Sequence, residues 1–140
     1  MNLAAVMADV EQKLKTITGL RTFPYSARKV SPPAATVALP DDLTYDLTYG
    51  RGSDQLTLMI LVVVGEATAR TATTDLAAYA DGSGERSVKE TVDGRSLKGA
   101  ADDRPYDEAT VTKVVFLVPT IGGTEYLAAE FTVMITGKGR

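Results

Sequence analysis

The sequence contains no cysteine and no histidine. Without cysteine, the chain can form neither disulfide bonds nor thiolate metal sites. Without histidine, it lacks the commonest general base and the partner that a serine triad requires. We therefore expect a protein that is not an enzyme and that has no cofactor or metal site.

Tryptophan is also absent, and aromatic residues make up only 6% of the chain, so the core must consist mainly of Val, Leu, Ile and Ala. Hydrophobic residues make up 44% of the 140 positions, which is close to the globular average and sufficient for a core. This length suits one ordinary domain. No repeat or linker is visible, and we expect a single domain over residues 1–140.

The charge is nearly balanced, with 15 Lys and Arg against 18 Asp and Glu and a net charge of -3. No basic run is present, so neither specific nucleic-acid binding nor attraction to an anionic membrane is expected. The sequence shows no targeting segment. The longest apolar stretch, residues 58–65, is too short to cross a bilayer.

Apolar residues recur at helical spacing near the start of the chain and predict a helix over residues 3–17. Asn2 suits the N-cap, and Gly19 stands where a left-handed residue often ends a helix. The predicted polar face of this helix consists of Asp9, Gln12, Lys13 and Thr16.

Three strands are predicted in the next part of the chain. Prolines break residues 20–40 into short extended pieces, of which 35–39 is a candidate strand. Residues 43–49 alternate in polarity, as in a strand with one wet face. Residues 55–65 are apolar on both faces, which is typical of a central strand. The segment between them, residues 50–54, is predicted to be a loop.

Two helices and a hairpin follow. Residues 68–79 have helical spacing, and Ser87 with Glu90 has the spacing of a capping box that begins a short third helix. Residues 94–108 are polar, and we expect them to be flexible. Strands over 110–118 and 126–136 flank a turn at Gly122-Gly123. This order predicts an α+β fold with a mostly antiparallel sheet of about five strands and helices packed on one face.

Four short motifs superficially suggest chemistry. Residues 50–54 lack the Lys and helix of a phosphate loop, and 81–85 lack the length of an EF-hand loop. The acids at 102–108 lie in one segment, whereas metal-assisted hydrolysis needs acids that converge from separate elements. Ser26 and Lys29 match a catalytic Ser-x-x-Lys spacing without its companion motifs. Turns and solvated loops are the better interpretation of all four.

Several segments in a fixed order resemble one protein family. Residues 18–25 read TGLRTFPY, 32–35 read PPAA, 45–54 read YDLTYGRGSD, and 76–84 read LAAYADGSG, before the closing strand from Tyr126 to Gly137. In these segments the chain resembles tail terminator (tail completion) proteins of long-tailed bacteriophages, especially those of actinobacterial phages. The resemblance spans nearly the whole chain.

The resemblance implies a structural role in the virion. Proteins of this family are small α/β subunits of a hexameric ring, which caps the tail tube, ends tube polymerisation and joins the tail to the head-side connector. The implied partners are other copies of the chain, the tail tube protein and the connector or neck protein. The implied location is the head-proximal end of the tail, after assembly in the host cytoplasm. The family offers no catalytic residue to carry over.

Ring assembly requires loops that contact neighbouring chains, because loops carry most interaction residues. We therefore predict that partner-binding residues lie in the polar loops, namely Arg51, Asp54, Arg86, Asp103 and Arg104. Ordinary solvated loop charges explain each of these residues equally well. Two other functions also remain open: a head-closure or neck protein of the same machine, and a small-molecule binding module with a polar pocket.

Overall fold

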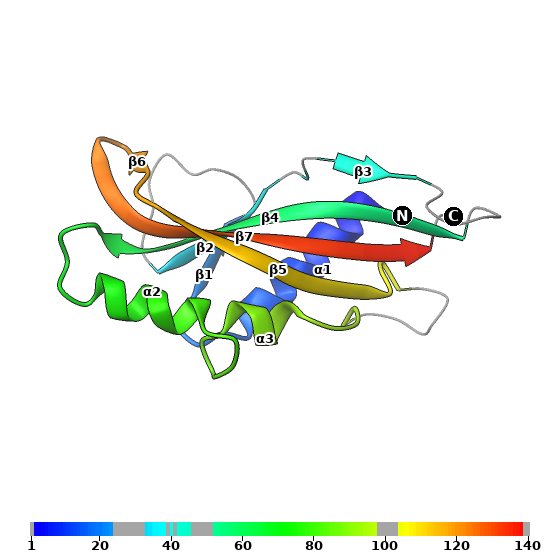
Figure 1. Cartoon of the computed structure of the whole chain (residues 1–140), viewed down its shortest axis with the longest axis horizontal. Helices are drawn as coiled ribbons and strands as arrows, with labels where there is room; N and C mark the ends of the chain where they lie inside the picture. Colours follow the sequence, from blue (N-terminus) through cyan, green and yellow to red (C-terminus); the bar gives the residue numbers. More distant parts are fainter. Residues whose placement is uncertain are drawn as a thin grey trace.

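The structure is a computed structural model that describes residues 2–23, 33–38, 40, 42–45, 52–97 and 104–138. It contains a curled mixed sheet with a few helices, so the fold is α+β (Figure 1). The helices are α1 (Leu3–Lys15), α2 (Ala72–Ala80) and α3 (Val88–Val92). The strands are β1 (Arg21–Phe23), β2 (Ala34–Val37), β3 (Asp42–Thr44), β4 (Ser53–Glu66), β5 (Glu108–Leu117), β6 (Thr120–Ile121) and β7 (Thr124–Lys138).

Within the described ranges the sheet has seven strands, with the main order β1-β2-β4-β7-β5. Only β1 and β2 pair in parallel; the other pairs of described strands are antiparallel. β3 pairs with β4 beyond the end of β2, and β6 continues the turn between β5 and β7. The two long strands β4 and β7 therefore form the centre of the sheet, and β5 lies at one edge (Figure 1).

Fully buried residues alternate with less buried ones along the centre of the sheet. Leu56, Leu58, Ile60 and Val62 of β4 are fully buried, and they face Ile135, Val133, Phe131 and Ala129 of β7. The residues between them are mostly half-buried, which fits a central strand with a less covered second face. The predictions of a long strand over 55–65 and of a hairpin closed by Gly122-Gly123 are confirmed, and both glycines have positive φ.

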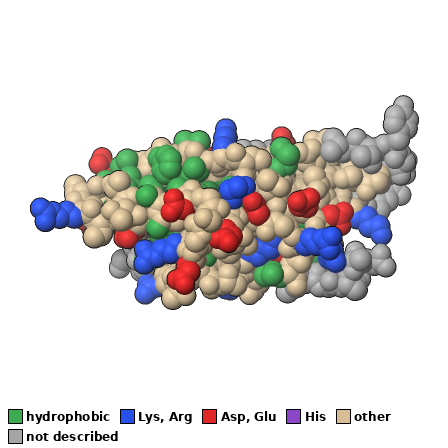
Figure 2. Space-filling view, turned by 60° about the horizontal axis from the view of Figure 1, so that its bottom comes forward, with side chains coloured by type: hydrophobic (Ala, Val, Ile, Leu, Met, Phe, Trp, Pro, Cys, Tyr) green, Lys and Arg blue, Asp and Glu red, His purple; other side chains and the backbone are tan. Residues whose placement is uncertain are grey.

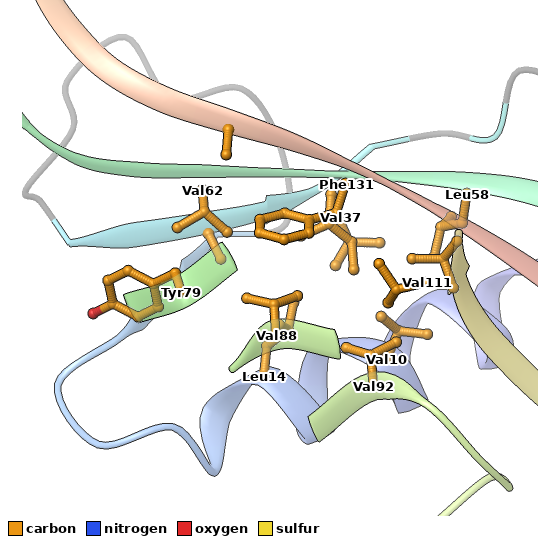
Figure 3. Packing of buried hydrophobic residues seen from close by; sticks show 14 of the residues in the cluster. Val10, Leu14, Val37, Leu58, Val62, Tyr79, Val88, Val92, Val111 and Phe131 are labelled. Atoms are coloured by element: carbon orange, nitrogen blue, oxygen red, sulfur yellow. The ribbon is translucent and has the colours of Figure 1, made fainter. Parts of the chain in front are cut away.

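One buried cluster joins the sheet to all three helices. Figure 3 shows Val10 and Leu14 of α1, and Val88 and Val92 of α3, near the side chains from the sheet. Phe131 of β7 lies among them. As the composition predicts, aliphatic side chains dominate this core; its largest members also include Tyr106 and Phe131. Burial of these side chains supplies the main driving force for the fold.

The ends of the helices agree in part with the predicted caps. The side chain of Asn2 accepts a 3.1 Å hydrogen bond from the Ala5 N–H, as expected for an N-cap. Ser87 likewise accepts from the Glu90 N–H at 3.1 Å. A full capping box also requires the Glu90 carboxylate to accept from the Ser87 N–H. This part of the prediction is wrong, because the Glu90 carboxylate accepts from the Gly84 N–H at 2.6 Å. Glu90 therefore fastens the turn that precedes α3.

Several predicted boundaries differ from the structure; the first helix, for example, ends at Lys15 and not at residue 17. α2 begins at Ala72 and not at residue 68, because residues 67–71 form turns. The strand predicted over 43–49 is present only as β3; residues 46–51 lie outside the described residues. The loop predicted over 50–54 is wrong at its end, since β4 already begins at Ser53.

Candidate functional site

The structure describes three of the five predicted partner-binding residues, namely Asp54, Arg86 and Arg104. Arg51 and Asp103 lie outside the described residues. Asp54 lies on β4 opposite Gly137, and its side chain is fully buried. The prediction that Asp54 lies in a partner-facing loop is therefore wrong. The predicted loop, residues 50–54, included the first two residues of β4.

The other two residues occupy different environments. Arg86 lies in the turn before α3, and its side chain is 54% exposed. Its Nη1 forms an ion pair with Oδ1 of Asp75 on α2 at 3.4 Å. Arg104 is half-buried and precedes Tyr106. Within the part of the chain that the structure describes, Arg86 is thus the one predicted partner-binding residue that is well exposed.

A small cavity of about 280 Å³ adjoins Arg86, near the low end of the range for small-molecule sites. Burial raises the pKa of Tyr79 in its wall, Asp75 raises it further, and Arg86 lowers it. The phenol therefore stays protonated and can act as a hydrogen-bond donor or acceptor. The residues that line the cavity are Thr18, Gly19, Pro33, Val64, Asp75, Tyr79 and Arg86.

A buried polar cluster, here called the Asp9 cluster, connects α1 to the segment between α3 and β5. The Asp9 carboxylate is 1% exposed and accepts hydrogen bonds on both oxygens. Tyr106 donates to Oδ1 at 2.7 Å, while Ser96 and the Leu97 N–H donate to Oδ2 at 2.8 and 3.0 Å. These bonds offset the desolvation of a buried carboxylate, which is otherwise costly.

Lys13 completes the Asp9 cluster one helical turn after Asp9. Its ammonium donates a 2.9 Å hydrogen bond to the Val92 carbonyl and lies 5.1 Å from the centre of the Tyr106 ring. This second contact has the geometry of a cation–π interaction. Lys13 therefore links α1 both to the end of α3 and to the segment before β5.

Burial governs the protonation of the Asp9 cluster. Desolvation lowers the pKa of Lys13, against the opposing fields of Asp9 and Asp93. Desolvation also raises the pKa of Tyr106 well above its usual range, and the hydrogen bond to Asp9 adds to the shift. The phenol therefore remains a donor to the carboxylate at all ordinary pH values.

The Asp9 cluster corrects two predictions. Asp9 and Lys13 were expected on the polar face of the first helix, but both side chains are buried. Residues 94–108 were expected to be flexible, but Ser96, Leu97 and Tyr106 are fixed to α1. Sequence reasoning missed the cluster because its members are far apart in the chain. The one local signal is that Asp9 precedes Val10 of the buried stripe.

A second polar group, here called the strap, covers the first part of the outer edge of β5. It consists of Lys89, Asp93 and Gly94. Gly94 exchanges two backbone hydrogen bonds with Ala109, at 2.9 and 2.8 Å. Asp93 accepts from the Val111 N–H at 2.7 Å, and Lys89 donates to the Val111 carbonyl at 3.1 Å. The backbone groups of this half of the strand are therefore satisfied.

Residues 112–118, which are the remaining part of β5 and the one residue after it, form what we call the free edge. No described strand lies beyond β5 in the sheet. Val115, Phe116 and Val118 are 45%, 58% and 51% exposed. Exposed apolar side chains along an unpaired strand edge are typical of a site where another strand pairs. This part of the molecule is the strongest candidate for an interaction surface.

The helical side of the molecule carries charged side chains of both signs. Figure 2 shows Lys and Arg side chains intermixed there with Asp and Glu, while hydrophobic side chains gather toward the left end. Mixed charges of this kind disfavour strong attraction to a polyanion.

Comparisons with known proteins give no family assignment. No protein-family model matches the chain, and no curated protein sequence matches it. Among the described residues, no three acidic side chains converge as a metal ion would require. No helix within the described ranges is long and apolar enough to span a bilayer.

Proposed function

We propose that this chain is a structural subunit of a long-tailed bacteriophage, and that it acts as the tail terminator. In this role, copies of the chain form a hexameric ring on the last ring of the tail tube. The ring ends tube polymerisation and presents a surface to the head-side connector. The resemblance across segments 18–25, 32–35, 45–54 and 76–84 supports the family.

The single observation that carries an assembly role is the free edge. The described residues include six exposed large hydrophobic side chains, and three of them, Val115, Phe116 and Val118, lie together on this edge. A globular chain leaves such a row of β-branched and aromatic side chains open to water at a cost. The cost is removed when another protein chain covers them.

The rest of the fold suits a subunit that contacts several neighbours. We propose a mostly antiparallel sheet with the helices gathered on one face, so that the edges and the second face serve for contacts. Arg86 and Arg104 then act as polar contacts, and the proposal extends to Arg51 and Asp103, which lie outside the described residues. Contacts between unlike surfaces of identical chains close into a ring when the rotation permits.

A neck protein of the same machine is the second candidate, because the free edge would serve it equally well. The two functions differ in the partner that the chain meets first. A terminator binds the end of the tail tube, whereas a neck protein binds the connector side and ignores bare tubes. Tube growth is therefore the property that separates them.

The experiment is a tube-growth assay with purified tail tube protein. Tube length is measured by electron microscopy as increasing amounts of this chain are added during polymerisation. A terminator shortens the tubes in proportion to its concentration and leaves preformed tubes intact. Unchanged tube lengths at a molar excess of the chain would refute the proposal and favour the neck protein.

A further inference from the structure

Among the described residues, no strand pairs with the outer backbone groups of the free edge. Carbonyl and N–H directions alternate along a strand, and Ala109 and Val111 direct theirs away from β7 toward the strap. The register shifts between Val111 and Lys113, which adds one residue to β5 and moves the alternation by one. The outward-directed groups beyond this bulge are therefore those of Val114 and Phe116.

The free edge is closed at both ends. The strap occupies the outer edge as far as Val111. At the other end, Pro119 has no N–H group to donate. A pairing strand therefore has access to residues 112–118, and the midpoint of this range is Val115.

We propose that a second copy of this chain pairs with the free edge, strand against strand and antiparallel, across a two-fold axis at Val115. This register places Val114 of each copy opposite Phe116 of the other. Both residues direct their backbone groups outward, so each such pair exchanges two hydrogen bonds. The two β5 strands then join the two sheets into one continuous sheet.

The side chains favour a second copy over a foreign strand, because the free edge is its own complement in this register. Phe116 meets Val114 of the other copy, an aromatic and β-branched pair of the kind that stabilises sheets. Val115 meets Val115, and Lys113 meets Leu117. The one charged residue of the edge thus faces no like charge, and exposed apolar area on both copies is covered.

This contact uses the same free edge that carries the assembly role, but it does not require that the chain is a tail terminator. A two-fold contact pairs a surface with itself, so alone it ends at a dimer, whereas a ring requires contacts between two different surfaces. Its test needs neither tail tubes nor a phage. Failure of the two-fold pairing and failure of the terminator proposal are therefore separate results.

The absence of native cysteine makes a clean crosslinking test possible. Residues directly opposite at a non-hydrogen-bonded position have Cα atoms about 4.5 Å apart, which suits a disulfide. The variant Val115→Cys should therefore form a disulfide-linked dimer under mild oxidation. Thr110→Cys is the matched control: it is exposed on the same strand, but its two copies would lie roughly 33 Å apart in this register.

The mass in solution, measured by light scattering over a range of concentrations, completes the test. The unmodified chain should change from one chain to two, and Phe116→Lys should weaken this association at least about tenfold, because each substitution acts twice across the axis. Circular dichroism and thermal melting check that Phe116→Lys is folded. The proposal is overturned by a chain that stays monomeric, by equal crosslinking of Thr110→Cys, or by self-association that Phe116→Lys leaves unchanged.

Discussion

The phenol of Tyr106 donates a 2.7 Å hydrogen bond to the carboxylate of Asp9, a residue 97 positions away in the chain. Tyr106 is fully buried, and Asp9 is almost so. The bond joins α1 to the segment that leads into β5, and it positions that segment. The edge strand therefore depends on a buried carboxylate in a helix on the other side of the core.

Asp9→Asn should destabilise the fold by about 3 kcal/mol, because it removes an acceptor and leaves Asp93 as the one remaining carboxylate whose field opposes the desolvation of Lys13. The measurement is urea unfolding followed by circular dichroism. Glu85→Gln makes the same chemical change in an exposed turn and should have almost no effect. Equal stability of the two variants would contradict the structural role of Asp9.

Stability should fall as the pH rises above about 10.5. The pKa values of Tyr79 and Tyr106 are raised above the ordinary 10.0, so the folded state keeps protons that the unfolded state releases. Lys13 acts in the opposite direction below 10.5, because its lowered pKa makes the unfolded state bind more protons there. Of these three groups, only the two tyrosines affect the slope above 10.5.

The alkaline slope can be assigned by substitution. Tyr106→Phe should flatten the decline of the urea midpoint above pH 10.5, although it also lowers stability at neutral pH through the lost bond to Asp9. Tyr45→Phe is the control, because Tyr45 is 67% exposed and should leave the slope unchanged. A steep decline that persists in Tyr106→Phe would show that other groups cause the alkaline unfolding.

Ser87→Ala should lower the melting temperature, with a cost of about 1 kcal/mol. Its hydroxyl caps α3 by accepting from the Glu90 N–H, and it donates to the Asp81 carbonyl. Ser83→Ala, in the exposed turn nearby, should be neutral. Calorimetry of the two variants decides the point, and equal melting temperatures would rule out the cap.

Gly123→Ala should cost about 1 kcal/mol, because Gly123 has a φ of +83° that residues with a Cβ rarely adopt. Steric crowding does not cause this loss of stability, since an added Cβ meets nothing within 4 Å. Gly82→Ala has the same open surroundings without a positive φ, and it should be neutral or slightly stabilising. Chemical denaturation of both variants separates backbone strain from packing, and equal costs would contradict strain.

Arg86→Glu should reduce tail joining, measured as infectious particles in a complementation assay. The double variant Asp75→Arg with Arg86→Glu restores the ion pair with its charges exchanged. Recovery in the double variant would show that the pair matters only within the subunit. Continued failure supports direct contact of Arg86 with a partner, and normal joining by the single variant would remove Arg86 from the interface.

The strands were predictable where one local pattern decides the structure. The sequence of β4 is apolar on both faces, which predicts a central strand, and the Gly122-Gly123 turn fixes β5 as the hairpin partner of β7. Asp54 was misplaced because Gly52 and Ser53 give a loop-like composition, whereas pairing with Gly137 at the far end of β7 extends the strand. Tertiary pairing overrode the local signal there.

The Asp9 cluster was not predictable from the helix alone. On the sequence of α1, Asp9 and Lys13 look like solvent-facing charges four residues apart. Their burial depends on Ser96, Tyr106 and the Val92 carbonyl, which are contributed by distant segments. A helical pattern shows which residues share a face, but it does not show which polar groups from distant segments will form hydrogen bonds with them.

The most direct test of the central claim is electron microscopy of tail tubes incubated with the purified, labelled chain. The account predicts a six-fold ring at one end of each tube, and no label along the shaft. Tubes whose ends stay bare at saturating concentrations of the chain would contradict it.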